Sequence, residues 1–164
     1  MQFTIETEQD RETPEEEILA LTARSMGGNW TTKSSHQLRI GREPIKDLSL
    51  VAFKDDVLVG TVRLWSITAG TGGDALLLGP LAIEPELQGL GLGQRMLKDV
   101  ISRAKAAKYG AIILVGDALY YERSGFSSKP TWHLRMPGRY DQNRLLGYEL
   151  VEGYLDGAEG VITR

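Results

Sequence analysis

A glycine-rich segment in the middle of the chain constrains the fold more than any other feature. An apolar run ends at Ile83, and after a turn the chain continues as Gln88-Gly89-Leu90-Gly91-Leu92-Gly93 into a segment with the pattern of a helix. Glycines let a backbone approach a ligand closely, and the free N–H groups at a helix start point towards an anion. This order favours a pyrophosphate site formed by the backbone amides from Gly89 to Gln94. The alternative is a turn that only connects a strand to a helix.

The spacing of these glycines differs from that of the common nucleotide-binding loops. Gly-x-Gly-x-x-Gly is typical of dinucleotide-binding folds, and Gly-x-x-x-x-Gly-Lys followed by Ser or Thr is typical of folds that bind nucleoside triphosphates. The segment Gln88–Gly93 has neither pattern. It resembles instead the acyl-coenzyme A loop of the GCN5-related N-acetyltransferase (GNAT) superfamily. A nucleotide-binding protein of another fold is the alternative, and the missing lysine motif argues against it.

Composition limits the class of protein. The chain has 164 residues with 41% hydrophobic and 25% charged residues, which is typical of one soluble globular domain, and no linker divides residues 1–164. The net charge of −3 does not favour a nucleic-acid partner, which normally needs a basic face. There is no cysteine, so disulfides, thiolate nucleophiles and zinc–thiolate sites are excluded. His36 and His133 are too far apart in sequence to suggest a metal site, so we expect no metal.

The lengths of the apolar stretches indicate where in the cell the protein is expected. The longest of them, residues 75–83 and 111–115, are far shorter than the roughly 20 residues that span a bilayer. The segment Met1–Glu12 is polar and acidic, unlike a secretory signal. We therefore expect a cytoplasmic protein with no membrane partner.

The order of predicted elements indicates an α/β (α+β) fold. Two strands flank Lys54-Asp55-Asp56 as a hairpin, and a helix joins two buried strands that are therefore expected to be parallel. We predict a mixed, mostly antiparallel sheet of about seven strands, with a splayed parallel pair at its centre and helices on its faces. Helices are predicted at 13–26, 35–40, 91–108 and 119–124, and strands at 3–6, 48–53, 57–65, 75–83, 111–115, 126–128, 132–136 and 147–150.

The ends of two helices carry specific signals. Thr13 is a predicted N-cap with Pro14 in the first turn, and Gly27-Gly28 is predicted to stop that helix. The later helix is predicted to end at Gly110.

The buried strand at 75–83 contains Gly79-Pro80, which predicts a bulge or splay because proline cannot donate to a sheet ladder. A simple bend is the alternative. The string Leu78-Gly79-Pro80-Leu81-Ala82-Ile83, taken with Leu114-Val115-Gly116-Asp117, resembles the YhbS-like group of predicted N-acetyltransferases. This resemblance implies that the backbone of Leu81, Ala82 and Ile83 binds the pantetheine arm of the coenzyme. It also implies that the amide of Leu81 polarises the thioester carbonyl.

A second group of residues follows the strand at 111–115. Many members of the superfamily have a tyrosine four residues before a Gly-Phe pair, and Tyr121 has this position relative to Gly125-Phe126. The resemblance implies that its phenol protonates the departing thiolate, and a phenol is protonated at neutral pH. Packing of the short helix is the alternative, and Tyr120 is the competing tyrosine. Asp117 is the candidate general base, with capping of the short helix as its alternative.

The resemblance places the acceptor site near residues 29–42 and the strand at 57–65. Trp30, His36, Arg63 and Trp65 are candidate substrate-binding residues. The alternatives are core positions for the two tryptophans and a structural or solvated role for the histidine. Arg39, Arg42 and Arg63 either form surface salt bridges or bind an acidic group of the substrate or the coenzyme.

These residues together predict an acyl-CoA-dependent N-acyltransferase. It is expected to transfer acetyl from acetyl-CoA directly to a primary amine of a small molecule or protein, without an acyl-enzyme. The first alternative is a non-catalytic module that binds acyl-CoA as a sensor or regulator. A transferase that acts on charged tRNA is a second alternative, disfavoured by the acidic pI of about 5.5. The resemblance also implies a possible homodimer formed by the late strands.

Overall fold

A computed structural model describes residues 2–27 and 30–164. Its main sheet has six strands in the order β1-β2-β3-β4-β5-β7, and β6 and β8 form a separate two-stranded sheet. The strands are β1 (Thr4–Thr7), β2 (Leu50–Lys54), β3 (Val57–Thr68), β4 (Asp74–Ile83), β5 (Ala111–Val115), β6 (Leu134–Arg135), β7 (Leu145–Glu149) and β8 (Gly160–Val161). The α-helices are α1 (Glu15–Met26), α2 (Leu92–Ala106) and α3 (Ala118–Glu122), and 3-10 helices lie at Trp30–Thr32, Ser34–Leu38, Gly70–Gly72, Pro85–Leu87 and Gln142–Arg144.

The central strands of the main sheet separate at one end. All neighbouring strands are antiparallel except β4 and β5, as the sequence predicted. This parallel pair is joined only at Leu76–Ile112 and Leu77–Ile113, whereas β4 continues to Ile83. The predicted splay is therefore confirmed, and it opens the sheet on the β5 side of β4.

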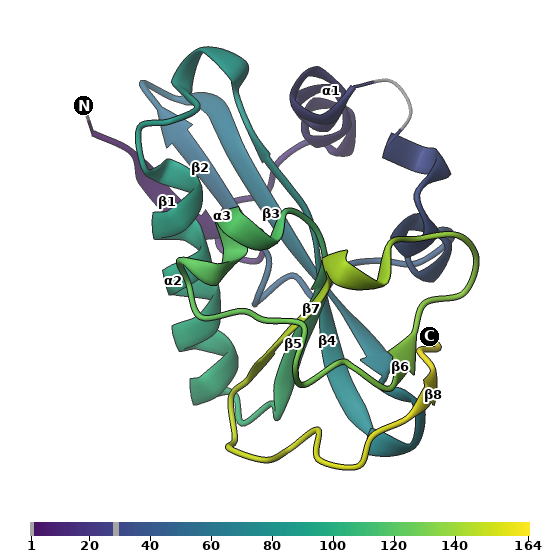
Figure 1. Ribbon diagram of the computed structural model, residues 1–164. Helices are drawn as coiled ribbons and strands as arrows, with labels where there is room; N and C mark the ends of the chain where they lie inside the picture. The colour runs from purple at the N-terminus through teal and green to yellow at the C-terminus, as the bar shows by residue number, and fades with distance from the viewer. Residues whose placement is uncertain (1, 28–29) are drawn as a thin grey trace.

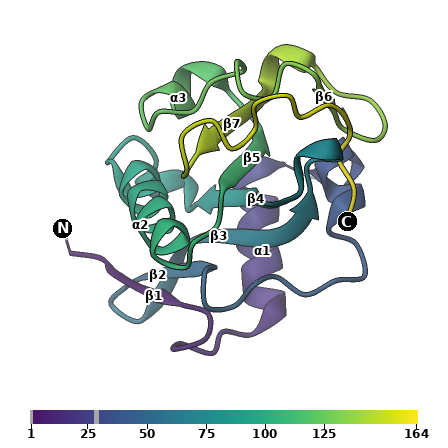
Figure 2. The same ribbon diagram turned by 90° about the horizontal axis from the view of Figure 1, so that it is seen from below.

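Helices cover both faces of the sheet (Figures 1 and 2). On one face α2 buries an apolar stripe that includes Leu92, Met96 and Val100. On the other face Ile18 and Leu21 of α1 pack in a cluster with residues of β2, β3 and β4. The splay lies at the upper end of the sheet in Figure 1, between α3 and the segment that follows α1.

The helix ends differ in detail from the predictions. The N-cap of α1 is Pro14 rather than Thr13, because the Thr13 hydroxyl donates to the carbonyl oxygen of Arg11 at 3.2 Å instead of accepting from the helix. Gly27 caps the other end with a φ of 86°, and Gly28 lies outside the described residues. Helix α2 ends at Ala106, before the predicted stop, because the backbone of Lys108 already has a left-handed φ of 67°.

The late strands were predicted less well. Residues 126–128 form only an isolated bridge between Ser127 and Gly147. The strand predicted at 132–136 is reduced to β6, because Pro130 lies in a turn closed by a bond from Trp132 N–H to the Lys129 carbonyl oxygen. The pairing of β6 with β8 was not predicted.

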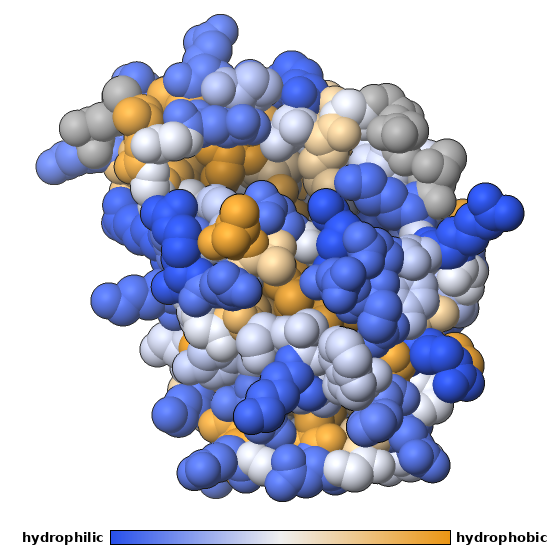
Figure 3. Space-filling model, viewed as in Figure 1, coloured by the Kyte–Doolittle hydropathy of each residue, from blue (hydrophilic) through white to orange (hydrophobic). Residues whose placement is uncertain are grey.

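The surface on the side shown in Figure 3 mixes hydrophilic and hydrophobic groups, with apolar areas interrupted by charged side chains. Within the described ranges, no helix combines the length and the hydropathy needed to cross a membrane.

Candidate active site at the strand splay

A cavity of about 280 Å³ lies where β4 and β5 separate. Its walls come from the second half of β4, the β5–α3 connection, the end of α1, the segment 33–39 and Gln88 at the start of the glycine loop. Five predicted coenzyme-binding or catalytic residues line it together: Leu81, Ile83, Gln88, Asp117 and Tyr121. The splay thus joins the predicted coenzyme-binding segments and the predicted catalytic groups in one space.

The bulge in β4 directs backbone groups into this cavity. The β3–β4 register shifts between the Leu64–Leu78 and Val62–Leu81 pairs, so Gly79-Pro80 is the irregular segment. The amide of Ile83 points away from β3, since it lies 3.3 Å from the Ser25 hydroxyl oxygen, which accepts its hydrogen bond. Backbone groups two residues apart on a strand point to the same side. The N–H of Leu81 therefore also points away from β3, towards the open side of β4.

The glycine loop presents free amides at the start of α2. Gly89 and Gly91 have φ angles of 84° and 89°, which favour glycine, and the loop is exposed. Gly91 is the N-cap of α2 and no side chain caps this end, so the first N–H groups of the helix remain available to an anion. This geometry is suited to the predicted pyrophosphate contact.

Two glutamine side chains support this loop from inside. The Gln88 amide nitrogen donates to the Ile83 carbonyl oxygen at 3.1 Å. The Gln94 amide nitrogen donates to the Tyr120 carbonyl oxygen at 3.0 Å, and its oxygen accepts from the Ser124 hydroxyl. Both side chains therefore hold the loop in place.

Tyr121 lies in the cavity wall on α3. Its ring packs edge-on against Tyr120 and Phe126, with centroids 5.0 and 5.9 Å apart. Burial raises the pKa of the Tyr121 phenol, and the neighbouring Tyr120 and Asp117 raise it further. The phenol therefore stays protonated at neutral pH.

Asp117 has the capping role that the sequence analysis gave as its alternative. Its exposed carboxylate accepts a hydrogen bond from the Leu119 N–H at 3.0 Å, at the start of α3. It still lines the cavity and is the one acidic residue among the described residues of that wall.

A second cavity of about 180 Å³ lies beyond Pro80, on the side of α1. All four predicted substrate-binding residues line it: Trp30, His36, Arg63 and Trp65. Pro80 and Arg39 line both cavities and mark their boundary. The sequence prediction thus placed these four residues around one space next to the splay.

The side chains of Arg63 and Trp65 are already engaged in this structure. Arg63 is buried and donates to both Glu8 and Glu15, so it forms a buried ion pair rather than a surface salt bridge. The indole N–H of Trp65 donates to the Gly79 carbonyl oxygen at 2.6 Å. The charge of Arg63 is therefore neutralised within the protein and the Trp65 N–H is already used, so both residues serve here as parts of the cavity wall.

The comparisons with known proteins decide the family. The model of the acetyltransferase (GNAT) family matches residues 15–126, which is more than half of the chain. The chain belongs to the acetyltransferase (GNAT) family. As a GNAT member it is an N-acetyltransferase, as the sequence predicted, and the non-catalytic alternative finds no support.

Individual GNAT proteins resemble it over nearly their whole length. The uncharacterized N-acetyltransferase YhbS of Escherichia coli K12 is 26% identical over 147 residues, which cover 88% of this chain and 87% of YhbS. The crystal structure of E. coli YhbS in complex with CoA has a TM-score of 0.80 at 24% identity, covering 99% of this chain and 89% of that one. A GNAT acetyltransferase of Brucella melitensis in complex with acetyl-CoA has a TM-score of 0.71 at 20% identity and covers 99% and 96%.

His36 and Arg39 of this GNAT site differ in their charge at neutral pH. The Nδ1 atom of His36 is buried and has no partner among the described residues. Burial lowers the pKa of His36, and the charge of Arg39 lowers it further, so the imidazole is neutral at pH 7. Burial lowers the pKa of Arg39 to about 10, which still leaves it charged.

Sequence reasoning missed some parts of the GNAT site. Ser25 at the end of α1 and Arg144 before β7 line the first cavity, but neither belongs to a motif. For Arg39 the sequence left open a surface salt bridge or an acidic ligand; the side chain is 6% exposed, which excludes the surface position. No local pattern reveals these positions, because they depend on how distant segments pack.

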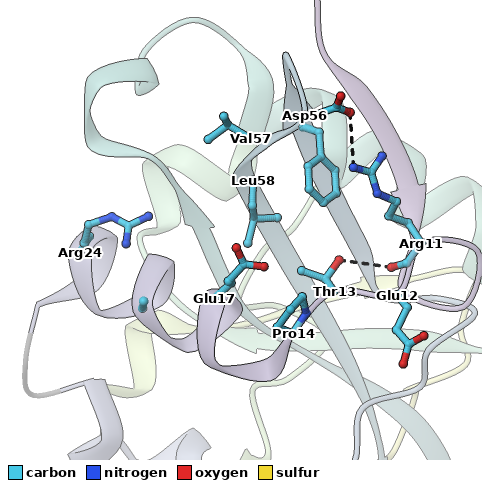
Figure 4. A pocket seen from close by; sticks show the side chains of 11 residues that line it. Arg11, Glu12, Thr13, Pro14, Glu17, Arg24, Asp56, Val57 and Leu58 are labelled. Atoms are coloured by element: carbon cyan, nitrogen blue, oxygen red, sulfur yellow. Dashed lines mark hydrogen bonds and ion pairs between the residues drawn. The ribbon is translucent and has the colours of Figure 1, made fainter.

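A further cavity lies away from this site. A cavity of about 420 Å³ is found between the first half of α1 and the β2–β3 turn, where Glu17 points towards Leu58 (Figure 4). Arg11 spans its rim in an ion pair with Asp56 at 3.6 Å. None of the predicted catalytic or coenzyme-binding residues lines it. Within residues 2–27 and 30–164, no group of three or more acidic or histidine side chains is placed to hold a metal ion.

Proposed function

We propose that this GNAT enzyme transfers the acetyl group of acetyl-CoA directly to a primary amine. The observation that carries the proposal is the single cavity lined by Leu81 on the open side of β4, by Gln88 at the start of the glycine loop and by Tyr121. The YhbS and Brucella structures contain CoA and acetyl-CoA, which supports the same cosubstrate for this chain.

In this proposal the backbone binds most of the cosubstrate. The amides from Gly89 to Gln94 hold the pyrophosphate at the start of α2, with help from the helix dipole. The side of β4 that faces away from β3, from Leu81 to Ile83, binds the pantetheine arm by strand-like hydrogen bonds, and at Ile83 the arm replaces the bonds to Ser25 and Gln88. The Leu81 N–H donates to the thioester carbonyl oxygen and stabilises the negative charge that develops there during attack.

The transfer itself needs a nucleophile, a proton acceptor and a proton donor. The amine nitrogen attacks the carbonyl carbon, a C–N bond forms and the C–S bond breaks. Asp117 accepts the proton that the amine loses, through water. Tyr121 donates its phenolic proton to the sulfur. Burial raises the pKa of Tyr121, so its phenol still carries the proton when the thiolate leaves.

The direct test is product formation by the purified protein. Acetyl-CoA is incubated with a panel of primary amines, thiol release is followed, and mass spectrometry identifies the product. We expect thiol release that depends on the amine, with an added acetyl group on nitrogen. Tight binding of acetyl-CoA without turnover of any amine would contradict the proposal and favour a sensor.

A further inference from the structure

Two arginine side chains of this protein are equally buried but differently neutralised. Arg63 is 5% exposed and Arg39 is 6% exposed. The guanidinium of Arg63 donates four hydrogen bonds of 2.6–3.0 Å to the carboxylates of Glu8 and Glu15. Buried charges are normally paired in this way because their desolvation is unfavourable.

Arg39 has no such carboxylate. Across residues 2–27 and 30–164, none of the ion pairs includes Arg39. The remaining residues Met1, Gly28 and Asn29 carry no carboxylate side chain. The protein itself therefore supplies no counter-ion to this buried cation.

The position of Arg39 links it to the reaction. It follows the 3-10 helix Ser34–Leu38, and its Nη1 atom lies 3.4 Å from the point that a Cβ on Gly79 would occupy. Gly79 belongs to the β4 bulge, next to Pro80, at which the two cavities meet. The charge of Arg39 is therefore at the boundary between the proposed thioester site and the proposed acceptor site.

We propose that Arg39 binds a carboxylate of the acceptor, so that the enzyme acetylates a small primary amine that carries a carboxylate, as an amino acid does. This inference rests on the proposed function. The carboxylate supplies the counter-ion that Arg39 lacks, through charge-assisted and bidentate hydrogen bonds. The amine of the same molecule forms the new amide bond, and its carboxylate is unchanged by the reaction.

The second cavity fits a small acceptor. Its volume of about 180 Å³ is below the roughly 300 Å³ at which pockets for drug-sized ligands begin. The rings of Trp30 and His36 meet edge-on at 5.3 Å in its wall, and Ile18 and Ile40 add apolar surface. A lysine side chain of a protein has no carboxylate near its amine, so the acceptor is a free small molecule.

The other charges around the two cavities favour an anion as well. Lys33 and Arg144 line the first cavity together with a single acidic residue, Asp117. In the second cavity, the described acidic residue Glu15 is already paired with Arg63. The combined site is therefore positive, which attracts an anionic acceptor and raises its local concentration.

The test compares matched amines on the wild-type enzyme and on variants of Arg39. Free amino acids are paired with their carboxamides, which keep the side chain and the amine but lack the carboxylate charge, and kcat/KM is measured with acetyl-CoA and corrected for the neutral fraction of each amine at the assay pH. We expect wild type to prefer the best amino acid over its amide by at least about 100-fold. Arg39→Met should lower kcat/KM for the amino acid by about the same factor and leave the amide within about threefold. Arg39→Lys should restore part of the loss.

The controls separate the possible outcomes. Arg103→Gln removes an exposed arginine that is paired with Asp99 on α2, and it should leave both substrates unchanged. Calorimetric titration with acetyl-CoA should give the same affinity for Arg39→Met as for wild type, which shows that the variant is folded. A loss of coenzyme binding would instead assign Arg39 to the coenzyme phosphates and overturn the inference.

Two further results would overturn it. Equal or better acetylation of the amides would leave the proposed function intact but show that the acceptor needs no carboxylate. A strong preference of wild type for succinyl-CoA over acetyl-CoA, lost in Arg39→Met, would assign the carboxylate to the acyl donor. Failure to acetylate any amine of either kind would refute the proposed function itself, and this inference with it.

Discussion

The indole Nε1 of Trp65 donates a hydrogen bond of 2.6 Å to the carbonyl oxygen of Gly79. This bond joins β3 to the irregular segment of β4, where the regular ladder between the two strands is interrupted. The buried carbonyl oxygen is satisfied by a side chain instead of a strand neighbour. The bulge that directs the Leu81 amide outwards is therefore held by a residue on the opposite strand.

Trp65→Phe keeps an aromatic ring in the core but removes this donor. We expect it to lower the free energy of unfolding by about 1–3 kcal/mol, because the Gly79 carbonyl is left without a partner. The kcat should also fall, because the Leu81 amide loses its fixed position. Urea denaturation and steady-state rates measure both effects, and Trp132→Phe is the control because Trp132 is 57% exposed. Unchanged stability and rate in Trp65→Phe would show that the bond does not hold the bulge.

Tyr121→Phe removes the proposed proton donor while keeping the ring that packs on Phe126. We expect kcat to fall by about 10²–10⁴-fold, the usual contribution of general acid catalysis. Since the pKa of Tyr121 is raised by burial, its ionisation should cause no loss of rate between pH 7 and about 10. Tyr120→Phe should change kcat by less than about threefold. Similar losses in the two variants would contradict the assignment of the acid to Tyr121.

The two buried arginines should differ in their effect on stability. Arg63→Met leaves the buried carboxylate of Glu8 without a partner and should lower the free energy of unfolding by about 3–5 kcal/mol. Arg39→Met removes a buried charge that has no internal carboxylate, so we expect no loss, or a gain of about 1 kcal/mol, in the ligand-free protein. Urea denaturation of both variants tests this. A large decrease in the free energy of unfolding of Arg39→Met would indicate that groups of the protein itself stabilise the Arg39 charge.

Glu15 should make stability depend on pH in the acid range. Hydrogen bonds from Arg63 hold the pKa of Glu15 below its ordinary value of 4.5. A lowered pKa in the folded state stabilises the protein above the unfolded pKa, and this stabilisation is lost as the pH falls through the folded pKa. Because Glu15 is largely exposed, we expect Glu15→Gln to cost at most about 1 kcal/mol at pH 7. The difference from wild type should decrease as the pH falls below 4.5 and vanish below the lowered pKa of the folded state, whereas a difference that does not change with pH would contradict this origin.

Local sequence patterns were enough to predict the elements to which we assign the coenzyme. The glycine loop, the Gly79-Pro80 interruption and the helix between two buried strands each depend on neighbouring residues, and each was located correctly. The splay followed from proline, which cannot join a ladder. Leu81 and Tyr121 line one cavity only because β4 and β5 are parallel neighbours. Predicting that cavity therefore also depended on predicting this pairing correctly.

The acceptor side could be predicted only in part. Trp30, His36, Arg63 and Trp65 do line one cavity, but the sequence could not indicate that Arg63 is neutralised by Glu8, 55 residues earlier. The burial of Arg39 likewise depends on how its segment packs on β4. Long-range pairing of polar groups leaves no periodic signal, unlike the burial of an apolar helix face.

The central claim is that the start of α2 binds the pyrophosphate of acetyl-CoA. Calorimetric titration with acetyl-CoA tests it on wild type, Gly91→Val and Gly157→Val. Both glycines have a left-handed φ, 89° and 76°, and an added Cβ meets no atom within 4 Å at either position. The two substitutions therefore cause comparable backbone strain, but only Gly91 lies in the proposed site.

We predict micromolar binding to wild type and to Gly157→Val, and a loss of at least about 50-fold in Gly91→Val, because the side chain and the altered φ keep the loop amides from the phosphates. ATP should not bind to any of the three proteins. Equal affinities of Gly91→Val and wild type for acetyl-CoA, or no binding to wild type, would contradict the account.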